Sequence, residues 1–250
     1  MIRAIIFDFN GVIADDETPH LICFQQALAE ENLSLTNEEY YGPYLGMDER
    51  TCARLLLAKR DGTCDEVQSA RIAARKADLF HAYSLRHKPQ LFPGIAEFVK
   101  TAKVQYRLAI ASGGRRRQID AALSGTPIER DFEVIVAAED CPVGKPDPAI
   151  YRLTSERLNA AHMRSERIEP AECLVIEDTL AGVRSARAAG MYVLAVATTY
   201  PIDKLSEADA ALPNLQGVTP ETAISKLARI GHESRFAPGH SVARPPSKDE

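Results

Sequence analysis

The chain has 250 residues, of which 35 acidic and 30 basic side chains give a formal net charge of −5. This length suits one large α/β domain or a core that carries an insertion. The acidic balance and the lack of a long basic stretch argue against a nucleic-acid partner. No apolar run approaches the roughly 20 residues that a membrane span requires, so we expect no membrane partner either.

The cysteines are scattered and form no Cys-x-x-Cys pair; they are Cys23, Cys52, Cys64, Cys141 and Cys173. An odd, dispersed set is typical of free thiols in a reducing compartment. The sequence also opens without a charged leader and cleavage site. We therefore expect a cytoplasmic protein, and the sequence leaves its oligomeric state open.

The first predicted element is an apolar strand that ends in a turn containing Asp8, Asn10 and Gly11. The runs with this strand-like character are Ala4–Phe9, Arg107–Ala111, Val134–Ala137, Cys173–Ile176 and Tyr192–Val196. Each is followed by a turn and a helical pattern, which is typical of βαβ units. The sequence thus predicts an α/β fold, a doubly wound parallel sheet with helices on both faces. Ligands of such sheets bind beyond the carboxyl ends of the strands.

After the first strand, helical periodicity replaces strand-like runs as far as about Phe92. The helical patterns are His20–Glu31, Asn37–Tyr44, Arg50–Lys59 and Asp65–Arg86. We interpret residues 15–92 as an inserted α-helical cap on a core made of residues 1–14 and 93–230. Proline and glycine near residues 89–94 suggest a hinge for a lid. Residues 231–250 lack apolar periodicity, and we expect this tail to be disordered.

Asp8 closes the first strand, so its carboxylate should project at the sheet's carboxyl edge, where Gly11 permits a tight turn. Two later strand ends add groups suited to a phosphoryl ligand. Ser112-Gly113-Gly114 offers a hydroxyl and backbone N–H groups as an anion cradle, although an ordinary glycine turn would have the same sequence. Lys145 in Gly-Lys-Pro offers a compact positive charge, while Asp147 and Pro148 beside it also fit a helix start.

Glu177-Asp178 ends the fourth strand. Carboxylates that converge there on Asp8 would repel one another unless a hard divalent cation lay among them, and Mg²⁺ is the natural candidate. The alternative is that Asp178 caps a helix over Leu180–Ala189.

These motifs, in this order, resemble the haloacid dehalogenase-like (HAD) superfamily, and the helical insertion resembles the small cap of its phosphoglycolate phosphatase and β-phosphoglucomutase-like branch. The resemblance implies a Rossmann-like core in which Asp8 attacks phosphorus to form an aspartyl-phosphate. Ser112, Gly113 and Lys145 would hold the phosphoryl oxygens. Mg²⁺ would be bound by Asp8, the backbone carbonyl of Asn10 and Asp178, with Glu177 nearby.

Asn10 departs from the family pattern, which has an aspartate there as general acid and base. An amide does neither, and losing such a group typically slows a reaction by about 10²–10⁴-fold. The backbone carbonyl survives the change, so metal and phosphate binding should persist. Acyl and aryl phosphates should suffer least, because their leaving groups need little protonation.

Other branches of the family fit less well. Phosphonate cleavage uses a cap lysine where this chain has Glu49, and dehalogenases lack the metal site that Glu177 and Asp178 predict. The cap stretch 45–50 retains only Arg50 as a basic contact for a second phosphate. We therefore predict a Mg²⁺-dependent phosphatase of a small phosphorylated metabolite. The alternatives are a catalytically impaired phosphate- and metal-binding or regulatory protein, a phosphomutase-like phosphotransferase, and an engineered inactive variant.

Candidate specificity residues of the cap are His20, Gly46 and Arg50. His20 lies at the cap entry and could replace the missing acid or base, although a hinge or capping role is the alternative. Tyr40, Tyr41 and Tyr44 line either the substrate side or the cap interior. The run 115–117 of three arginines faces either a substrate anion or solvent.

Overall fold

The computed structural model describes residues 1–42, 44, 49–63, 65–161 and 166–228. Its centre is a six-stranded parallel sheet in the order β5-β4-β1-β6-β7-β8. In chain order the strands are β1 (Ala4–Phe7), β4 (Arg107–Ala111), β5 (Val134–Val136), β6 (Cys173–Glu177), β7 (Tyr192–Val196) and β8 (Ala210–Leu212). The predicted parallel sheet is confirmed. The sheet order places β1 between β4 and β6, so chemistry at the end of β1 has neighbours on both sides.

The predicted strands match β1, β4, β5, β6 and β7, with identical bounds for β4 and β7. β1 ends two residues earlier than predicted, because the Phe9 carbonyl accepts hydrogen bonds from the N–H groups of Val12, Ile13 and Ala14 and closes a tight turn. β8 was not predicted, because its sequence Ala210-Ala211-Leu212 lacks the β-branched and aromatic residues that favour strands.

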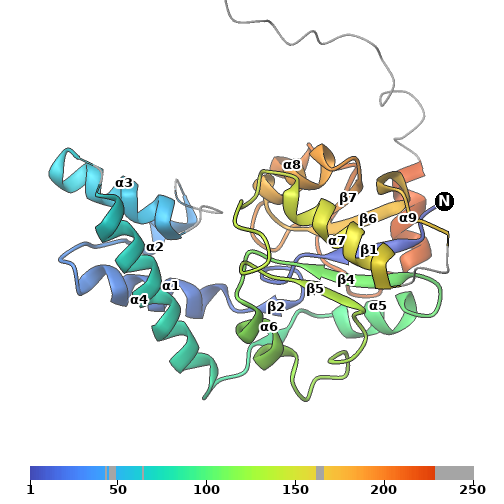
Figure 1. The fold of residues 1–250 in the computed structure, drawn as a ribbon, viewed down its shortest axis with the longest axis horizontal. Helices are drawn as coiled ribbons and strands as arrows, with labels where there is room; N and C mark the ends of the chain where they lie inside the picture. Colours follow the sequence, from blue (N-terminus) through green and yellow to red (C-terminus); the bar gives the residue numbers. More distant parts are fainter. Residues whose placement is uncertain (43, 45–48, 64, 162–165, 229–250) are drawn as a thin grey trace, which may run out of the picture.

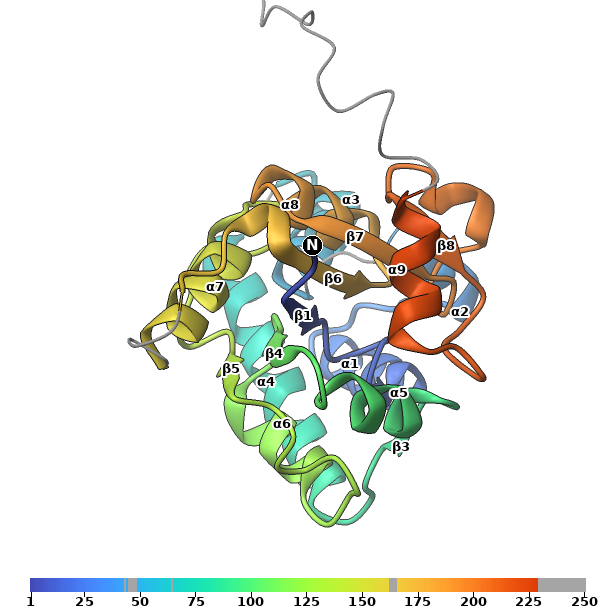
Figure 2. The same ribbon diagram turned by 90° about the vertical axis from the view of Figure 1, so that its right-hand side faces the viewer.

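Helices cover both faces of the sheet, as the doubly wound prediction requires (Figure 2). Helices α5 (Ile95–Ala102), α6 (Arg116–Leu123) and α9 (Pro220–Ala228) pack on one face, and α7 (Ala149–Ala161) and α8 (Leu180–Ala188) on the other. Short 3₁₀ helices lie at Pro170–Glu172 and Ile202–Leu205.

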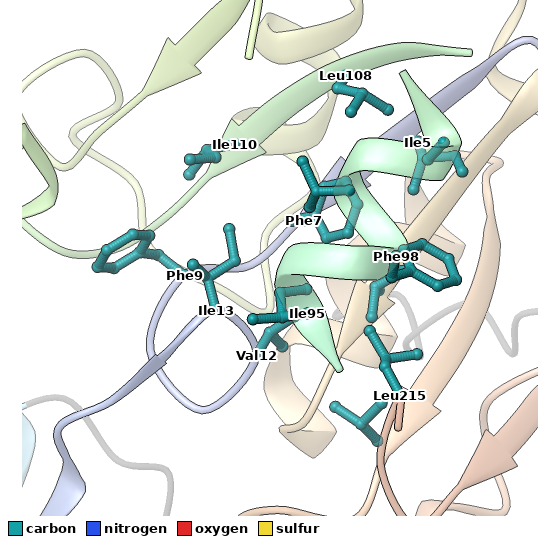
Figure 3. Close-up of a cluster of buried hydrophobic side chains, with 14 of the residues drawn as sticks. Ile5, Phe7, Phe9, Val12, Ile13, Ile95, Phe98, Leu108, Ile110 and Leu215 are labelled. Carbon is teal, nitrogen blue, oxygen red and sulfur yellow. The ribbon is translucent and has the colours of Figure 1, made fainter. Parts of the chain in front are cut away.

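Alternate residues of β1 enter opposite halves of the core, because successive side chains of a strand point to opposite faces. Ile5 and Phe7 join the cluster under α5 and α6, whereas Ala4 and Ile6 join the cluster under α7 and α8. Figure 3 shows Ile5 and Phe7 beside Phe98 of α5. The central strand is thereby buried from both sides, which holds the residues after it in place.

The segment predicted as the cap forms a separate group of helices beside the carboxyl edge (Figure 1). Its helices are α1 (Glu17–Ala29), α2 (Asn37–Tyr41), α3 (Glu49–Asp61) and α4 (Glu66–Ser84). They pack around their own buried cluster, which includes Leu21, Phe24, Leu56 and Ile72. Where the chain enters and leaves this segment, β2 (Ala14–Asp15) pairs antiparallel with β3 (Gln90–Leu91). The division into core and cap at the stated boundaries stays a prediction.

Within the described part of the chain, no helix is both long and apolar enough to cross a membrane. Cys23, Cys52, Cys141 and Cys173 are free thiols, as the spacing predicts. Cys64, Gly46 and the tail predicted to be disordered lie outside the described residues. The cytoplasmic location stays a prediction.

Phe98 should carry a large share of the stability of the core. Its side chain is 1% exposed, and its ring meets that of Phe7 edge-on with centroids 6.0 Å apart. We expect Phe98→Ala to lower the free energy of unfolding by about 3–5 kcal/mol, measured by chemical denaturation. Val104→Ala is the control, since Val104 is 77% exposed and should change the value by less than about 0.5 kcal/mol. Similar effects of both substitutions would contradict the packing described.

Candidate active site

Asp8 lies directly beyond β1, at the edge where the carboxyl ends of β4, β1 and β6 meet. Its N–H donates to the carbonyl of Ile176 over 2.9 Å, which extends the β1–β6 ladder by one residue and fixes the direction of the side chain. The residue is 7% exposed. A buried carboxylate in this position needs charged or hydrogen-bonding partners.

Lys145 supplies the positive partner, from the loop between β5 and α7. Its Nζ donates to Oδ1 of Asp8 over 2.5 Å and to Oε1 of Glu177 over 2.6 Å. It also lies 5.1 Å from the ring centroid of Tyr151. Burial lowers the pKa of Lys145, but the charges of Asp8 and Glu177 outweigh burial and raise it well above its usual value. Lys145 is therefore a fixed cation beside the Asp8 carboxylate.

Asp147 lies just before α7, but it is not the helix cap that the sequence predicts as an alternative. Oδ1 of Asp147 accepts a hydrogen bond from the N–H of Ala149 over 2.8 Å. The helix begins at Ala149, so Pro148 precedes it rather than occupying its first position. This contact of Asp147 leaves Lys145 free to reach Asp8.

Glu177 is completely buried, and both of its oxygens accept hydrogen bonds from protein groups. Oε1 accepts from Lys145 and from the Tyr151 hydroxyl at 2.8 Å. Oε2 accepts from the N–H groups of Asp178 and Thr179 at 2.9 Å and from the Thr179 hydroxyl at 3.0 Å. Burial raises the pKa of Glu177, but Lys145 and these donors lower it below its usual value overall. Glu177 thus anchors Lys145.

Asp178 has one oxygen without a partner. Its Oδ2 accepts from the Thr199 hydroxyl, whereas Oδ1 is buried and has no hydrogen-bond partner. The N-cap of α8 is Thr179, whose hydroxyl accepts from the N–H of Gly182 at 3.1 Å, so the helix-cap alternative for Asp178 is wrong. Gly11 makes room for Asp178, because a Cβ at Gly11 would lie 2.0 Å from Oδ2.

This set of acids fits a hard divalent cation. Asp8, Glu177 and Asp178 each offer an oxygen, and these atoms lie within 4.8 Å of one another. Burial raises the pKa of Asp8 to about 7, opposed by Lys145, and burial with the charges of Glu177 and Asp8 raises that of Asp178. Since protein donors already use both Glu177 oxygens, Asp8 and Oδ1 of Asp178 are the better ligands. Carboxylate oxygens are what Mg²⁺ prefers.

Ser112 and its glycines follow β4, next to Asp8. Ser112 is 1% exposed, and its Oγ accepts from the N–H of Gly114 at 2.9 Å. Gly113 is exposed and nothing lies within 4 Å of where its Cβ would be, so a ligand has access to its backbone. Neither glycine has a positive φ, so a left-handed turn is not the reason for them. The predicted phosphate loop and the nucleophile candidate therefore share one edge.

The Asn10 side chain is turned toward the cap segment. Its Nδ2 donates to both carboxylate oxygens of Asp16, at 2.8 and 2.7 Å, and lies 3.1 Å from Nε2 of His20. His20 stacks on Phe80 with a centroid distance of 3.8 Å. Lys76, which is 4% exposed, contacts Nδ1 of His20. His20 is thus part of a charged cluster at the cap entry.

Among the described cap residues, the other candidates make their contacts away from this site. Arg50 pairs with Glu66 at 2.9 Å within the cap segment. The Tyr40 hydroxyl donates to Glu17 at 2.6 Å, and Tyr40 and Tyr44 pack on the cap's buried cluster, so the interior alternative fits them. In the arginine run, Arg116 pairs with Asp120 on α6 and Arg117 lies 3.8 Å from Asp78 of α4.

Sequence reasoning missed Tyr151, Thr199, Asp16 and Lys76. Thr199 follows the predicted strand Tyr192–Val196, so its place near a strand end was an available signal. Tyr151 and Lys76 lie within helices, where nothing in the sequence separates a site residue from a core or surface one. Asp16 was inconspicuous in a run of three acids.

A family model described as haloacid dehalogenase-like hydrolase matches residues 2–190. Protein CbbY of Rhodobacter capsulatus is 32% identical over 239 residues, 90% of this chain and 99% of that protein. A phosphorylated carbohydrates phosphatase of Thermotoga maritima is 29% identical over 191 residues, 76% of this chain and 82% of that protein.

Two solved structures share the fold. A β-phosphoglucomutase from Clostridium difficile superposes with a TM-score of 0.77 at 21% identity, over 92% of this chain and 98% of the other. CbbY from Rhodobacter sphaeroides superposes with a TM-score of 0.72 at 27% identity, over 89% and 99%. That structure is of an aspartate-to-asparagine variant in complex with xylulose-(1,5)bisphosphate.

The chain therefore belongs to the haloacid dehalogenase-like hydrolases, as its motifs predict. Within that family it is a phosphatase similar to CbbY and to the phosphorylated carbohydrates phosphatase, and its fold is shared by β-phosphoglucomutase.

Gly182 tests whether Glu177 organises the site. A Cβ at Gly182 would lie 1.7 Å from Oε1 of Glu177 and would displace the carboxylate. We expect Gly182→Ala to break the buried ion pair with Lys145 and to lower the free energy of unfolding by about 3–5 kcal/mol, with weaker phosphate binding in calorimetry. Gly144→Ala is the control, because nothing lies within 4 Å of its Cβ position. Unchanged phosphate affinity in Gly182→Ala would contradict the anchoring role.

Proposed function

We propose that this chain is a Mg²⁺-dependent phosphatase of a small phosphorylated sugar that works through an aspartyl-phosphate on Asp8. The observation that supports this most directly is the pairing of Asp8 with Lys145 at 2.5 Å at the carboxyl edge of the sheet. Beside them, Oδ1 of Asp178 is buried without a hydrogen-bond partner, so a bound cation would satisfy this oxygen.

In this proposal Oδ of Asp8 attacks phosphorus, the bond to the leaving oxygen breaks, and water later cleaves the aspartyl-phosphate. Lys145 and the backbone of Gly113, with the Ser112 hydroxyl, hold the phosphoryl oxygens and offset their charge. Mg²⁺ held by Asp8, the Asn10 carbonyl and Asp178 would supply electrostatic stabilisation of the phosphoryl group. Glu177 keeps Lys145 in position through its hydrogen bond to Nζ.

The substrate class comes from the relatives. One is named as a phosphatase of phosphorylated carbohydrates, and CbbY has been solved with a sugar bisphosphate. The second example is an asparagine variant, which supports the view that an asparagine need not prevent binding of such a substrate. A phosphate-binding protein without turnover is the second candidate, because Asn10 lacks the proton transfer of an aspartate.

Phosphate release tests the proposal. We expect Mg²⁺-dependent release from acetyl phosphate, an aryl phosphate and a panel of sugar phosphates, fastest where the leaving group needs least protonation. Asp8→Asn should abolish release, whereas Asp120→Asn, an exposed acid on α6, should not change it. Release by Asp8→Asn at the parent rate would contradict the nucleophile. Binding of a phosphate analogue without release from any substrate would favour the second candidate.

Asp178 should carry the response to the metal. We expect Mg²⁺ to raise the thermal midpoint of the parent chain, and Asp178→Asn to lose most of that shift. Burial and the charges of Glu177 and Asp8 raise the pKa of Asp178, so removing its charge should not lower the midpoint of the metal-free protein. Calorimetric titration with Mg²⁺ provides a second measurement. An undiminished Mg²⁺ shift in Asp178→Asn would rule out this ligand.

A further inference from the structure

The contact between Asn10 and Asp16 is the most unusual feature of the site that the proposed reaction leaves unused. Asp16 occupies the N-cap position of α1 and is 4% exposed. An aspartate at this position normally accepts a hydrogen bond from the first turn of its helix, but Asp16 makes no such bond. Both of its oxygens accept from Nδ2 of Asn10 instead. The Asp16 carboxylate therefore binds Asn10 at the candidate active site and does not cap its own helix.

A chain of side-chain contacts within the cap segment holds Asp16 in this place. Nε2 of His20 on α1 lies 3.3 Å from Oδ2 of Asp16. Lys76 of α4 contacts Nδ1 of His20 and also pairs with Glu49 of α3. These groups connect three helices of the cap segment behind one carboxylate, so the position of Asp16 is set by packing and charge together.

The two ends of the Asn10 amide differ, and Asp16 decides which end faces the phosphate loop. An amide nitrogen only donates and an amide oxygen only accepts, so a reversed amide would set Oδ1 against a carboxylate. With Nδ2 on Asp16, Oδ1 lies 3.3 Å from the Cβ position of Gly114, on the side of the phosphate loop. Asn10 thus presents a hydrogen-bond acceptor toward the loop that follows Ser112.

We propose that Asp16 is a positioning residue for the hydrolysis, which fixes Asn10 so that Oδ1 orients the attacking water, and that Asn10 and Asp16 function only as a pair. The inference rests on the proposed function. The water oxygen forms a bond to phosphorus, and the bond from phosphorus to the Asp8 carboxylate breaks. One water proton stays on the new P–OH group, and the other passes to a phosphoryl oxygen and leaves with the phosphate. An aspartate at position 10 would instead put two carboxylates within hydrogen-bonding distance, where like charges repel.

A set of four proteins tests the pair: the parent, Asp16→Asn, Asn10→Asp, and the exchanged double variant Asn10→Asp with Asp16→Asn. Steady-state and burst kinetics with an aryl phosphate give kcat, KM and the lifetime of the phosphoenzyme. Vanadate binding and the thermal midpoint report on the site and the fold. Asp15→Asn is the matched control, since Asp15 is the exposed neighbour of Asp16 and undergoes the same chemical change.

We expect Asp16→Asn to lower kcat by about 10- to 100-fold, with KM and vanadate affinity within about threefold of the parent, because misorientation alone costs this much. A burst of the aryl alcohol should precede the slow phase, since formation of the phosphoenzyme needs no water. Asn10→Asp alone should not exceed the parent in kcat and should lower the thermal midpoint. The exchanged variant should recover both quantities.

Three results would overturn the inference. One is a kcat of Asp16→Asn equal to that of Asp15→Asn. Another is a parallel loss of kcat, vanadate affinity and thermal midpoint without a burst, which a purely structural role would give. The third is an Asn10→Asp variant as active as the exchanged variant.

The measurements distinguish failure of the proposed function from failure of the inference alone. If the parent releases no phosphate from any substrate, Asp16 positions nothing for hydrolysis and the inference fails with it. If the parent is active and Asp16→Asn equals it, the inference fails and the proposed function stands.

Discussion

The buried bridge from Asp8 through Lys145 to Glu177 is the interaction on which the candidate site depends. Lys145 comes from a loop, and a loop cation would normally be mobile in solvent. Here Glu177 binds the Lys145 ammonium, and Glu177 is in turn fixed by hydrogen bonds from the Tyr151 hydroxyl and from the N–H of Thr179 at the start of α8. Helices on one face of the sheet therefore determine where a positive charge meets the end of its central strand. A core substitution on that face would therefore change the position of Lys145 relative to Asp8 without contacting Asp8 directly.

Negative charge at this edge exceeds what Lys145 alone can balance. Asp8, Glu177 and Asp178 converge within a few ångströms, and Gly11 and Gly182 allow the carboxylates to approach where a Cβ would collide with them. Such an arrangement is costly in the absence of a further cation, because buried like charges raise one another's pKa. A bound metal ion would offset this repulsion between carboxylates and would at the same time attract a phosphoryl group. The buried charges therefore gather at this edge, while the strands of the sheet are apolar.

Much of this edge was predictable from the sequence, and the reason is the geometry of parallel sheets. Asp8, Ser112 and Glu177-Asp178 each follow an apolar run, and the carboxyl ends of neighbouring parallel strands necessarily meet. Tyr151 and Lys76 were not predictable, since both lie within helices and reach the site only through tertiary packing. The exchange of capping roles between Asp178 and Thr179 was equally hidden, because adjacent Asp and Thr both favour an N-cap. Patterns locate strand ends, but they do not say which helical side chain will reach them.

Asn10 shows how the interpretation of a single position depends on its neighbours in space. Taken by itself, an amide in place of an acid indicates a weakened enzyme. The structure adds Asp16, six residues further on, whose carboxylate lies against that amide and has given up its helix cap to do so. The carboxylate that is absent at position 10 is therefore present on the adjacent side chain of Asp16. Behind Asp16 lie His20, Lys76 and Glu49, which contact one another in turn. The Asn10 amide gives this buried carboxylate a hydrogen-bond donor, which an ionised aspartate at position 10 would not provide.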